Sequence, residues 1–113
     1  MREDGGNMDF FLNADELMIQ EVVRDFAQTE LKPNAAILDK EHRMDLGNLK
    51  KMAGLGFMGM NIPENYGGAE VGVVPYSLGM IEVARACAAT AVTMSVTNMV
   101  AEVICAFGTE KQK

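Results

Sequence analysis

Apolar residues recur at helical spacing over most of the chain. The first stripe, at i, i+3, i+4 and i+7, comprises Ile19, Val22, Val23 and Phe26. This spacing predicts an amphipathic helix, because residues three and four positions apart lie on one face of an α-helix. Asn13 and Glu16 have the spacing of a capping box, so the helix is expected to begin at Asn13. Pro33 lacks an amide hydrogen and is expected to kink or restart it.

The same pattern predicts further helices along the chain. A short helical piece is expected over residues 35–38, followed by a solvated, charge-rich connection over residues 39–43. Asp45 is placed to cap the next helix, and Pro75 fits the first position of another. The apolar positions of the helix after Asp45 are Leu46, Leu49, Met52 and Ala53. The positions repeating along one side of the helix after Pro75 are Val74, Leu78, Ile81 and Arg85, and Glu82 is a second polar interruption.

Residues 86–107 form the most apolar segment, and Glu102 is its only charge. The segment is long enough to span a bilayer. Its hydroxyl and amide residues argue against this, and Glu102 would cost about 2.5–3.5 kcal/mol at the centre of a membrane. The diluting residues are Thr90, Thr93, Ser95, Thr97 and Asn98. We therefore expect no membrane span but a helix that is buried nearly all round in a helical domain.

A glycine-rich stretch, residues 54–68, separates the helices into two hairpins. It contains five glycines, Pro63 and an Asn-Tyr-Gly-Gly turn, which is too irregular for a helix or a central strand. The predicted fold class is therefore all-α, a helical bundle of about five helices. Residues 9–113 are expected to form the domain, and residues 1–8 a disordered lead.

Charge and composition exclude some classes of function. The 113 residues include 10 basic and 16 acidic side chains, which gives a net charge of −6 without a basic cluster. Binding to nucleic acid is therefore not expected. The N-terminus has neither the apolar segment of a signal peptide nor an arginine-rich amphipathic helix, so we expect a cytoplasmic protein.

Candidate chemical motifs are few. Residues 54–59 spell the G-x-G-x-x-G of a dinucleotide-binding turn, but a helix leads into them where that turn requires a strand. His42 has no partner at ligand or triad spacing and is interpreted as a surface residue. Cys87 and Cys105 lack metal-site spacing and are interpreted as reduced core thiols. The ten methionines are interpreted as core-filling residues, including Met52, Met58, Met80, Met94 and Met99, rather than as a peptide-binding surface.

Three motifs, in order, resemble those of a known family. Residues 56–68 read Gly-Phe-Met-Gly-Met-Asn-Ile-Pro-Glu-Asn-Tyr-Gly-Gly and are similar to the "GLLGI-x-x-PEEYGG" signature of the acyl-CoA dehydrogenase family. Residues 8–33 resemble the opening helix of that family, and residues 107–113 its "GTEEQK" step. The resemblance covers the chain from Met8 onward and corresponds to the N-terminal helical domain.

The resemblance implies an oxidoreductase that removes hydrogens from the α and β carbons of an acyl-CoA and passes electrons to an electron-transfer flavoprotein. Such chemistry needs a carboxylate base and a flavin, FAD in this family. In the family the base and most flavin contacts lie in the middle β and C-terminal α domains, after the part that this chain resembles. We therefore assign this chain no catalytic, cofactor-binding or metal residue. Alone it is expected to be inactive and not to bind FAD tightly.

The resemblance also implies a homotetramer for the whole enzyme, and a dimer or weaker self-association for this chain alone. Acyl-CoA oxidases, nitroalkane oxidases and flavin-dependent monooxygenases share the domain, so the reaction could be one of theirs. A free-standing helical interaction module is the alternative from a different class of protein.

Counting back from Gly108 in the "GTEEQK" step gives the positions that line the acyl-chain cavity in the family. These positions are Ala91, Val92, Ser95, Val96 and Met99. Helical spacing places four of them on one face of the segment 86–107: Val92, Ser95, Val96 and Met99. The alternative is that this face is ordinary core. The bulk of Val96 and Met99 would shorten the cavity and favours short or medium acyl chains.

Overall fold

The computed structural model describes residues 10–113, and these are helical, with no strand among them. The all-α prediction is confirmed, and the expected disordered lead, residues 1–8, lies outside the described residues. The elements are α1 (Ala14–Phe26), the π-helical turn η1 (Ala27–Leu31), α2 (Lys32–Glu41), α3 (Leu46–Gly54), the 3₁₀ turn η2 (Glu64–Tyr66), α4 (Val73–Ala86) and α5 (Ala88–Phe107). Since η1 joins α1 to α2, these segments make four continuous helices.

The long first helix begins and bends where the sequence predicts. Asn13 accepts a hydrogen bond from the Glu16 amide at 2.8 Å, and the Glu16 carboxylate accepts one from the Asn13 amide at 2.9 Å, which completes the capping box. The break expected at Pro33 is the π turn that precedes it. Pro33 would crowd the carbonyl of Thr29, four residues earlier, and Thr29 lies inside this wider turn.

The connection predicted over residues 39–43 is shorter than expected. Helix α2 continues to Glu41, so the charged residues at its end are helical rather than a loop. Charged residues are compatible with an exposed helix, and a run of charge does not by itself end one. The helix ends at His42, whose left-handed backbone (φ 54°) lets the amide of Arg43 donate to the carbonyl of Leu38 at 3.2 Å.

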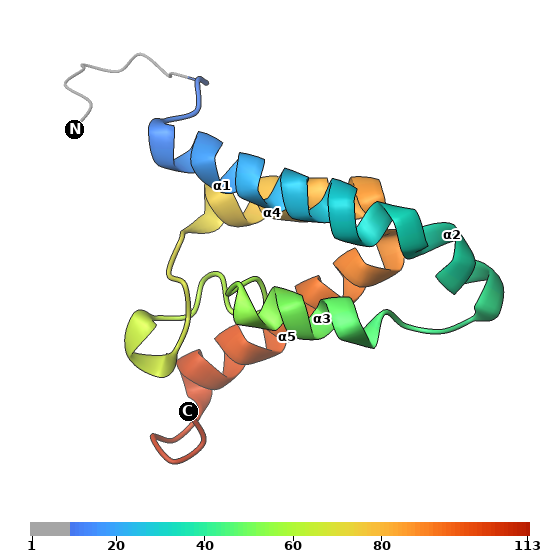
Figure 1. Cartoon of the computed structure of the whole chain (residues 1–113). Coiled ribbons are helices and arrows are strands. Elements are labelled where there is room, and N and C mark those ends of the chain that lie inside the picture. Colours follow the sequence, from blue (N-terminus) through green and yellow to red (C-terminus); the bar gives the residue numbers. More distant parts are fainter. Residues whose placement is uncertain (1–9) are drawn as a thin grey trace.

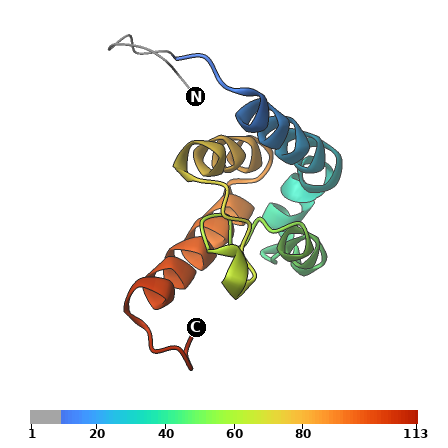
Figure 2. The ribbon, with the colours of Figure 1, turned by 90° about the vertical axis from the view of Figure 1, so that its left-hand side faces the viewer.

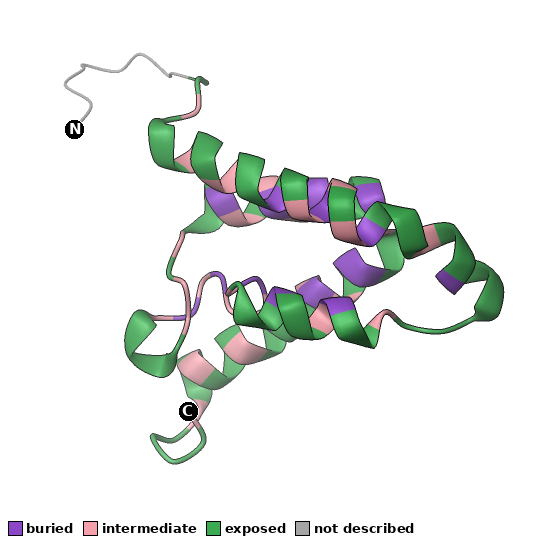
Figure 3. Ribbon diagram, viewed as in Figure 1, coloured by how far each residue is buried: buried purple, intermediate pink, exposed green. Residues whose placement is uncertain are grey.

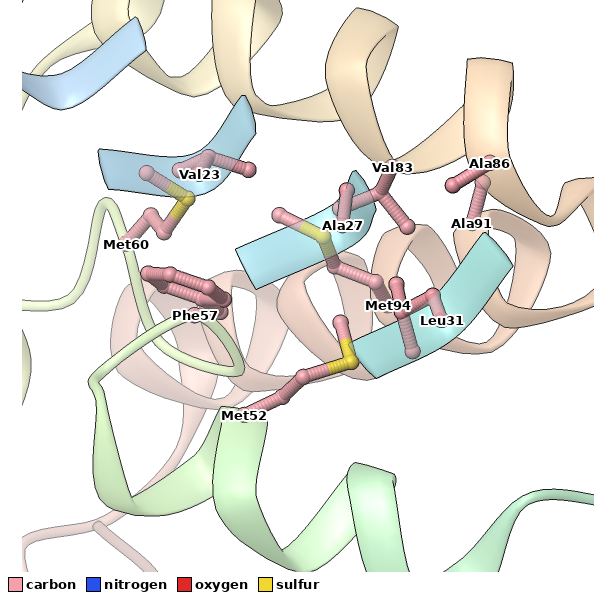
Figure 4. Packing of buried hydrophobic residues seen from close by; sticks show 10 residues of the cluster. All are labelled: Val23, Ala27, Leu31, Met52, Phe57, Met60, Val83, Ala86, Ala91 and Met94. Atoms are coloured by element: carbon pink, nitrogen blue, oxygen red, sulfur yellow. The ribbon is translucent and has the colours of Figure 1, made fainter. Parts of the chain in front are cut away.

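The helices form two layers around one core. Helices α1 and α4 lie side by side in one layer, while α3 and α5 lie in the other (Figure 1; turned by 90° in Figure 2). The segment that joins α3 to α4, residues 55–72, contains most of the glycine-rich stretch, and we call it the glycine-rich crossing. It runs from the end of α3 past α5 and back to the start of α4. The core lies between the layers, as the buried segments in Figure 3 and the side chains in Figure 4 show.

Methionine and aliphatic side chains fill this core. Its buried members are Val23, Ala27, Leu31, Met52, Phe57, Met60, Val83, Ala86, Ala91 and Met94. The rings of Phe26 and Phe57 meet edge to face with centroids 5.7 Å apart. The interpretation of the methionines as core-filling is right for Met52 and Met94 and wrong for Met99, which is 55% exposed.

Helix α4 buries a different face from the predicted one. It begins at Val73, so Pro75 is its third residue and not its first. Val74 and Ile81, assigned to the packing side, are exposed. The buried residues of α4 are Pro75, Gly79, Glu82, Val83 and Ala86. A charged residue therefore stands in the middle of the buried stripe.

An ion pair allows Glu82 to be buried. Its carboxylate accepts a hydrogen bond from the Arg24 guanidinium of α1 at 3.1 Å and lies 3.4 Å from that of Arg85. The Arg24 hydrogen bond lowers the pKa of Glu82, although burial alone would raise it. Because Arg24 keeps 44% of its side chain in solvent, the pair joins α1 to α4 at the edge of the core.

Replacing a core methionine tests the packing. We expect Met94→Ala to lower the free energy of unfolding by about 2–5 kcal/mol, because Met94 is fully buried at the meeting point of the layers. Ile37→Ala on α2 removes an exposed side chain and should change it by less than about 0.5 kcal/mol. Urea titration followed by far-ultraviolet circular dichroism measures both. Equal effects of the two substitutions would contradict this core.

Replacing Glu82 tests the ion pair through pH. Because its pKa is lowered in the folded state, Glu82 stabilises the fold above the ordinary glutamate pKa, and this stabilisation is lost as pH falls through the lowered value. We expect Glu82→Gln to cost about 1.5–3 kcal/mol at pH 7 and to flatten the fall of stability in acid. Glu21→Gln, exposed on α1, is the control. If the free energy of unfolding of Glu82→Gln falls with decreasing pH as steeply as that of the wild type, the lowered pKa of Glu82 is refuted.

Candidate functional site

The five residues predicted to line an acyl-chain cavity lie on α5 at different depths. Ala91 is buried in the core, and Ser95 is half-buried. Val92 is 62% exposed, and Val96 and Met99 are also exposed. Since successive residues of a helix are about 100° apart, the five span an arc from the buried seam to the open surface. Their role in a cavity stays a prediction.

Helix α5 is not buried nearly all round, so that expectation is wrong. Its buried residues are Thr90, Ala91, Met94 and Asn98. Large apolar residues that it exposes are Val92, Val96, Met99, Val100, Val103, Ile104 and Phe107, and we call these seven residues the open face of α5. The reason is that α4 and the glycine-rich crossing cover one side of α5, and none of residues 10–113 covers the other (Figure 3).

By length and composition α5 could cross a membrane, and only 22% of its most apolar window is buried. Length and composition alone are weak criteria, because a helix of a soluble protein also meets them. The expectation that α5 is not a membrane span stays a prediction.

Two hollows open on the surface of the described residues. The larger, of about 650 Å³, lies between the end of α2 and the start of α5, and its lining includes His42, Cys87 and Thr90. The smaller, of about 140 Å³, lies between α1 and the crossing, where Val22 and Leu55 are among its lining residues. None of the five predicted residues lines either hollow.

Few groups near these hollows carry chemistry of their own. His42 is exposed, and its left-handed backbone ends α2. Cys87 and Cys105 are free thiols of intermediate burial, and the Thr90 hydroxyl donates to the Cys87 sulfur at 3.2 Å. Across residues 10–113, no group of three or more His, Cys, Asp or Glu side chains could hold a metal ion.

The glycine motif at residues 54–59 does not have the geometry of a phosphate cradle. Helix α3 leads into it, as the sequence indicates, where such a cradle follows a strand. The amide of Gly56 donates to Ala53 at 3.1 Å, and that of Phe57 donates to Met52 at 2.9 Å. These amides are therefore not free to hold a pyrophosphate. The residues at the motif do not fit FAD, and we derive no chemical step through a flavin from them.

The crossing is instead tied to α5 by a residue that sequence reasoning missed. Asn98, about 1% exposed, accepts a hydrogen bond from the Met60 amide at 2.8 Å and donates to the Phe57 carbonyl at 2.9 Å. From the sequence, Asn98 is only one of the polar residues that weaken a membrane span. The available signal was an amide side chain at helical spacing from apolar Ala91 and Met94, where an unpaired amide would be costly.

A second link joins η2 to the end of the chain. The Tyr66 hydroxyl donates to the Glu110 carboxylate at 2.8 Å, and the Lys113 ammonium lies 3.3 Å from the other oxygen of Glu110. Lys113 also lies 5.9 Å from the centre of the Tyr66 ring. We call these three residues the clasp. It joins two of the motifs that carry the family resemblance.

The clasp shifts the titration of its members in opposite directions. The hydrogen bond to Glu110 raises the pKa of Tyr66, and partial burial adds to this. The same hydrogen bond, helped by Lys113, lowers the pKa of Glu110. Both directions follow from a hydrogen bond that favours the neutral phenol and the charged carboxylate.

The sequence and the fold were compared with those of known proteins. Residues 13–113 match the family described as "Acyl-CoA dehydrogenase, N-terminal domain". The short-chain specific acyl-CoA dehydrogenase of Bos taurus mitochondria is 47% identical over 97 residues, which are 85% of this chain and 24% of that protein.

Two solved structures share the fold. Butyryl-CoA dehydrogenase from Megasphaera elsdenii superposes with a TM-score of 0.84 at 31% identity. A chain from a study of the electron transferring flavoprotein of Acidaminococcus fermentans and flavin-based electron bifurcation superposes with a TM-score of 0.88 at 37% identity. Each match covers 93% of this chain and 28% of the other. The chain thus spans about a quarter of the length of these proteins.

Removing the Tyr66 hydroxyl tests the clasp. We expect Tyr66→Phe to speed amide hydrogen exchange several-fold at Gln112 and Lys113, whose amides donate to the Thr109 carbonyl, because the turn loses its link to η2. In the wild type the link is expected above the ordinary glutamate pKa and is lost as pH falls through the lowered pKa of Glu110. Tyr76→Phe on α4 is the control. Unchanged exchange in Tyr66→Phe would show that the clasp does not order this turn.

Proposed function

Because the chain belongs to the acyl-CoA dehydrogenase family, as a match to its N-terminal domain, we propose that it is the N-terminal helical domain of a flavin-dependent enzyme that oxidises acyl-CoA thioesters. The reaction is the α,β-dehydrogenation of the acyl group. The family membership applies to this domain. The activity, the substrate and the partners belong to the longer protein, and we infer them from the family membership.

The open face of α5 is the observation that carries this proposal. It presents seven large apolar side chains over about four turns of one helix, and apolar surface of this extent marks a place where another apolar body packs. The proposed cavity residues Val92, Val96 and Met99 belong to this face. We propose that one part of the face bounds the acyl chain and that the remainder packs against the other domains.

We propose a short acyl chain as substrate. Two of the relatives, the Bos taurus protein and the Megasphaera elsdenii enzyme, are named for short-chain and butyryl substrates. Bulky side chains at Val96 and Met99 support the same length, because they would fill the far part of a cavity that a longer chain needs. Ser95, half-buried beside them, is the polar member of the set.

This domain lines part of the acyl-chain cavity and contributes no group that reacts with the substrate. Oxidation of an acyl thioester needs a base for the α proton and an acceptor for the β hydride, and FAD supplies the hydride acceptor when it is bound. No residue of this chain is proposed for either role. Its contribution is to exclude water from the acyl chain and to set how much of that chain fits.

The proposed partners follow from the same membership. An electron-transfer flavoprotein would accept the electrons, and the longer enzyme would be a homotetramer. The separate domain would form a dimer or associate more weakly, because the open face of α5 would be exposed to water. We propose a cytoplasmic location and no membrane span.

Related flavoenzymes remain the second candidate. Acyl-CoA oxidases, nitroalkane oxidases and flavin monooxygenases would use the same helical domain with different chemistry in the other domains. A free-standing helical module is the candidate from another class. The reading frame after Lys113 separates the free-standing module from the flavoenzymes, because only the flavoenzymes would continue into a β domain and a second helical domain.

Enlarging the proposed cavity tests the function. In the longer enzyme, the wild type is expected to oxidise short-chain acyl-CoA with an electron-transfer flavoprotein or an artificial acceptor. Met99→Ala removes three heavy atoms and should shift the preference in kcat/KM towards longer acyl chains by roughly 1–3 kcal/mol. The measurement is kcat/KM over a series of saturated acyl-CoA lengths.

Met44→Ala is the matched control, because Met44 is 54% exposed and lies outside α5. It should leave the chain-length profile unchanged. If Met99→Ala lowers thermal stability and leaves the profile unchanged, Met99 is ordinary packing and not a cavity residue. If the wild type oxidises no acyl-CoA, the proposed function itself is wrong.

A further inference from the structure

Asn98 is the one asparagine on α5, and both the oxygen and the nitrogen of its side-chain amide are hydrogen-bonded. Its oxygen accepts a hydrogen bond from the Met60 amide at 2.8 Å, and its nitrogen donates to the carbonyls of Phe57 and Met94, both at 2.9 Å. Both amide protons are therefore paired, and the side chain is nearly inaccessible to water.

The two backbone groups of the crossing that Asn98 pairs have no other hydrogen-bond partner among residues 10–113. These groups are the Phe57 carbonyl and the Met60 amide. Phe57 and Met60 belong to an irregular stretch, so no regular helix or sheet pairs the Phe57 carbonyl or the Met60 amide. Their side chains belong to the same buried core cluster as Met94 (Figure 4), which keeps water away. A buried backbone group without a partner is costly, so the crossing is held at this place on α5.

The bond to Met94 adds a second constraint. It runs along α5 itself, from Asn98 to the residue four positions earlier, and so holds the Asn98 side chain against its own helix. The bonds to Phe57 and Met60 then fix that helix, rather than a mobile side chain, against the crossing. Rotation of α5 about its axis or sliding along it would break at least one bond.

The rotation of α5 decides which side chains face the proposed cavity. Successive residues are about 100° apart, so Met99 and Ser95 lie at fixed angles from Asn98, one residue after it and three residues before it. When Asn98 points into the core, Met99 points to the open face. A small turn of the helix would exchange the residues at the edge of that face.

We propose that Asn98 is a positioning residue for the acyl-chain cavity: by pinning α5 to the backbone of Phe57 and Met60, it fixes the rotation and height at which Ser95 and Met99 are presented to the substrate. This inference rests on the proposed function, because the cavity belongs to it. Asn98 itself touches no substrate and acts only through the orientation of α5.

The test is Asn98→Ser in the longer enzyme. A serine hydroxyl can still donate to the Met94 carbonyl, as serine often does four residues back in a helix, but it is too short to reach the crossing. The readout is the ratio of kcat/KM for butyryl-CoA to that for octanoyl-CoA. We expect this ratio to fall by about tenfold as α5 loses its fixed rotation.

A control separates positioning from general loss of stability. Val83→Ala removes a fully buried core side chain of α4 and leaves the bonds of Asn98 in place. Its thermal midpoint is expected to fall, and its butyryl-to-octanoyl ratio to stay within twofold of wild type. Hydrogen exchange at the Met60 amide should accelerate more in Asn98→Ser than in Val83→Ala.

The possible outcomes distinguish the positioning role of Asn98 from the proposed function. An active wild type with an unchanged ratio in Asn98→Ser would overturn the positioning role and leave the proposed function standing. A wild type that oxidises no acyl-CoA would overturn both. If Asn98→Ser does not fold, Asn98→Asp, which keeps the size of the side chain and its acceptor for Met60, is assayed in the same way. Failure of both variants to fold would assign Asn98 a structural role only.

Discussion

The fold depends on burying an irregular segment of backbone between helices. The glycine-rich crossing carries Phe57 and Met60 into the core, and its polar backbone must find partners there. The chain supplies them from within and from outside the segment: the Val71 amide donates to the Met60 carbonyl at 2.8 Å, and Asn98 bonds the crossing from α5. Without these bonds, backbone amides and carbonyls of the crossing would be buried between the two layers without hydrogen-bond partners.

Two glycines make this arrangement sterically possible. Gly67 has a positive φ of 86°, which favours glycine. At Gly68 a Cβ atom would lie only 2.0 Å from the Ile62 carbonyl oxygen, so a side chain cannot be accommodated without moving the backbone. The Asn-Tyr-Gly-Gly turn is thus a requirement of packing, and it also places Tyr66 where it can reach Glu110.

The same construction leaves α5 covered on one side. One face of the helix is committed to the crossing and α4, and the opposite face remains apolar and open. This asymmetry connects the fold to the proposed function. The contacts that hold one side of α5 against the crossing and α4 determine which side chains lie on its open face. The charged groups follow a related rule: Glu82 is buried where Arg24 reaches it, whereas Asp15, Glu21 and Asp25 of α1 are exposed to solvent.

Sequence alone determined the helical class, the capping box at Asn13, the distortion near Pro33 and the cap at Asp45, because these depend on residues within a few positions of one another. Its motifs also identified the family. Only the tertiary structure decided that Glu82 and Asn98 are buried, that Ile81 is not, and that α5 is open on one side. Each of these depends on partners far away in the chain, such as Arg24 and Met60. A hydrophobic pattern records how much apolar surface a helix has, but which face is covered is decided by the elements that pack on it.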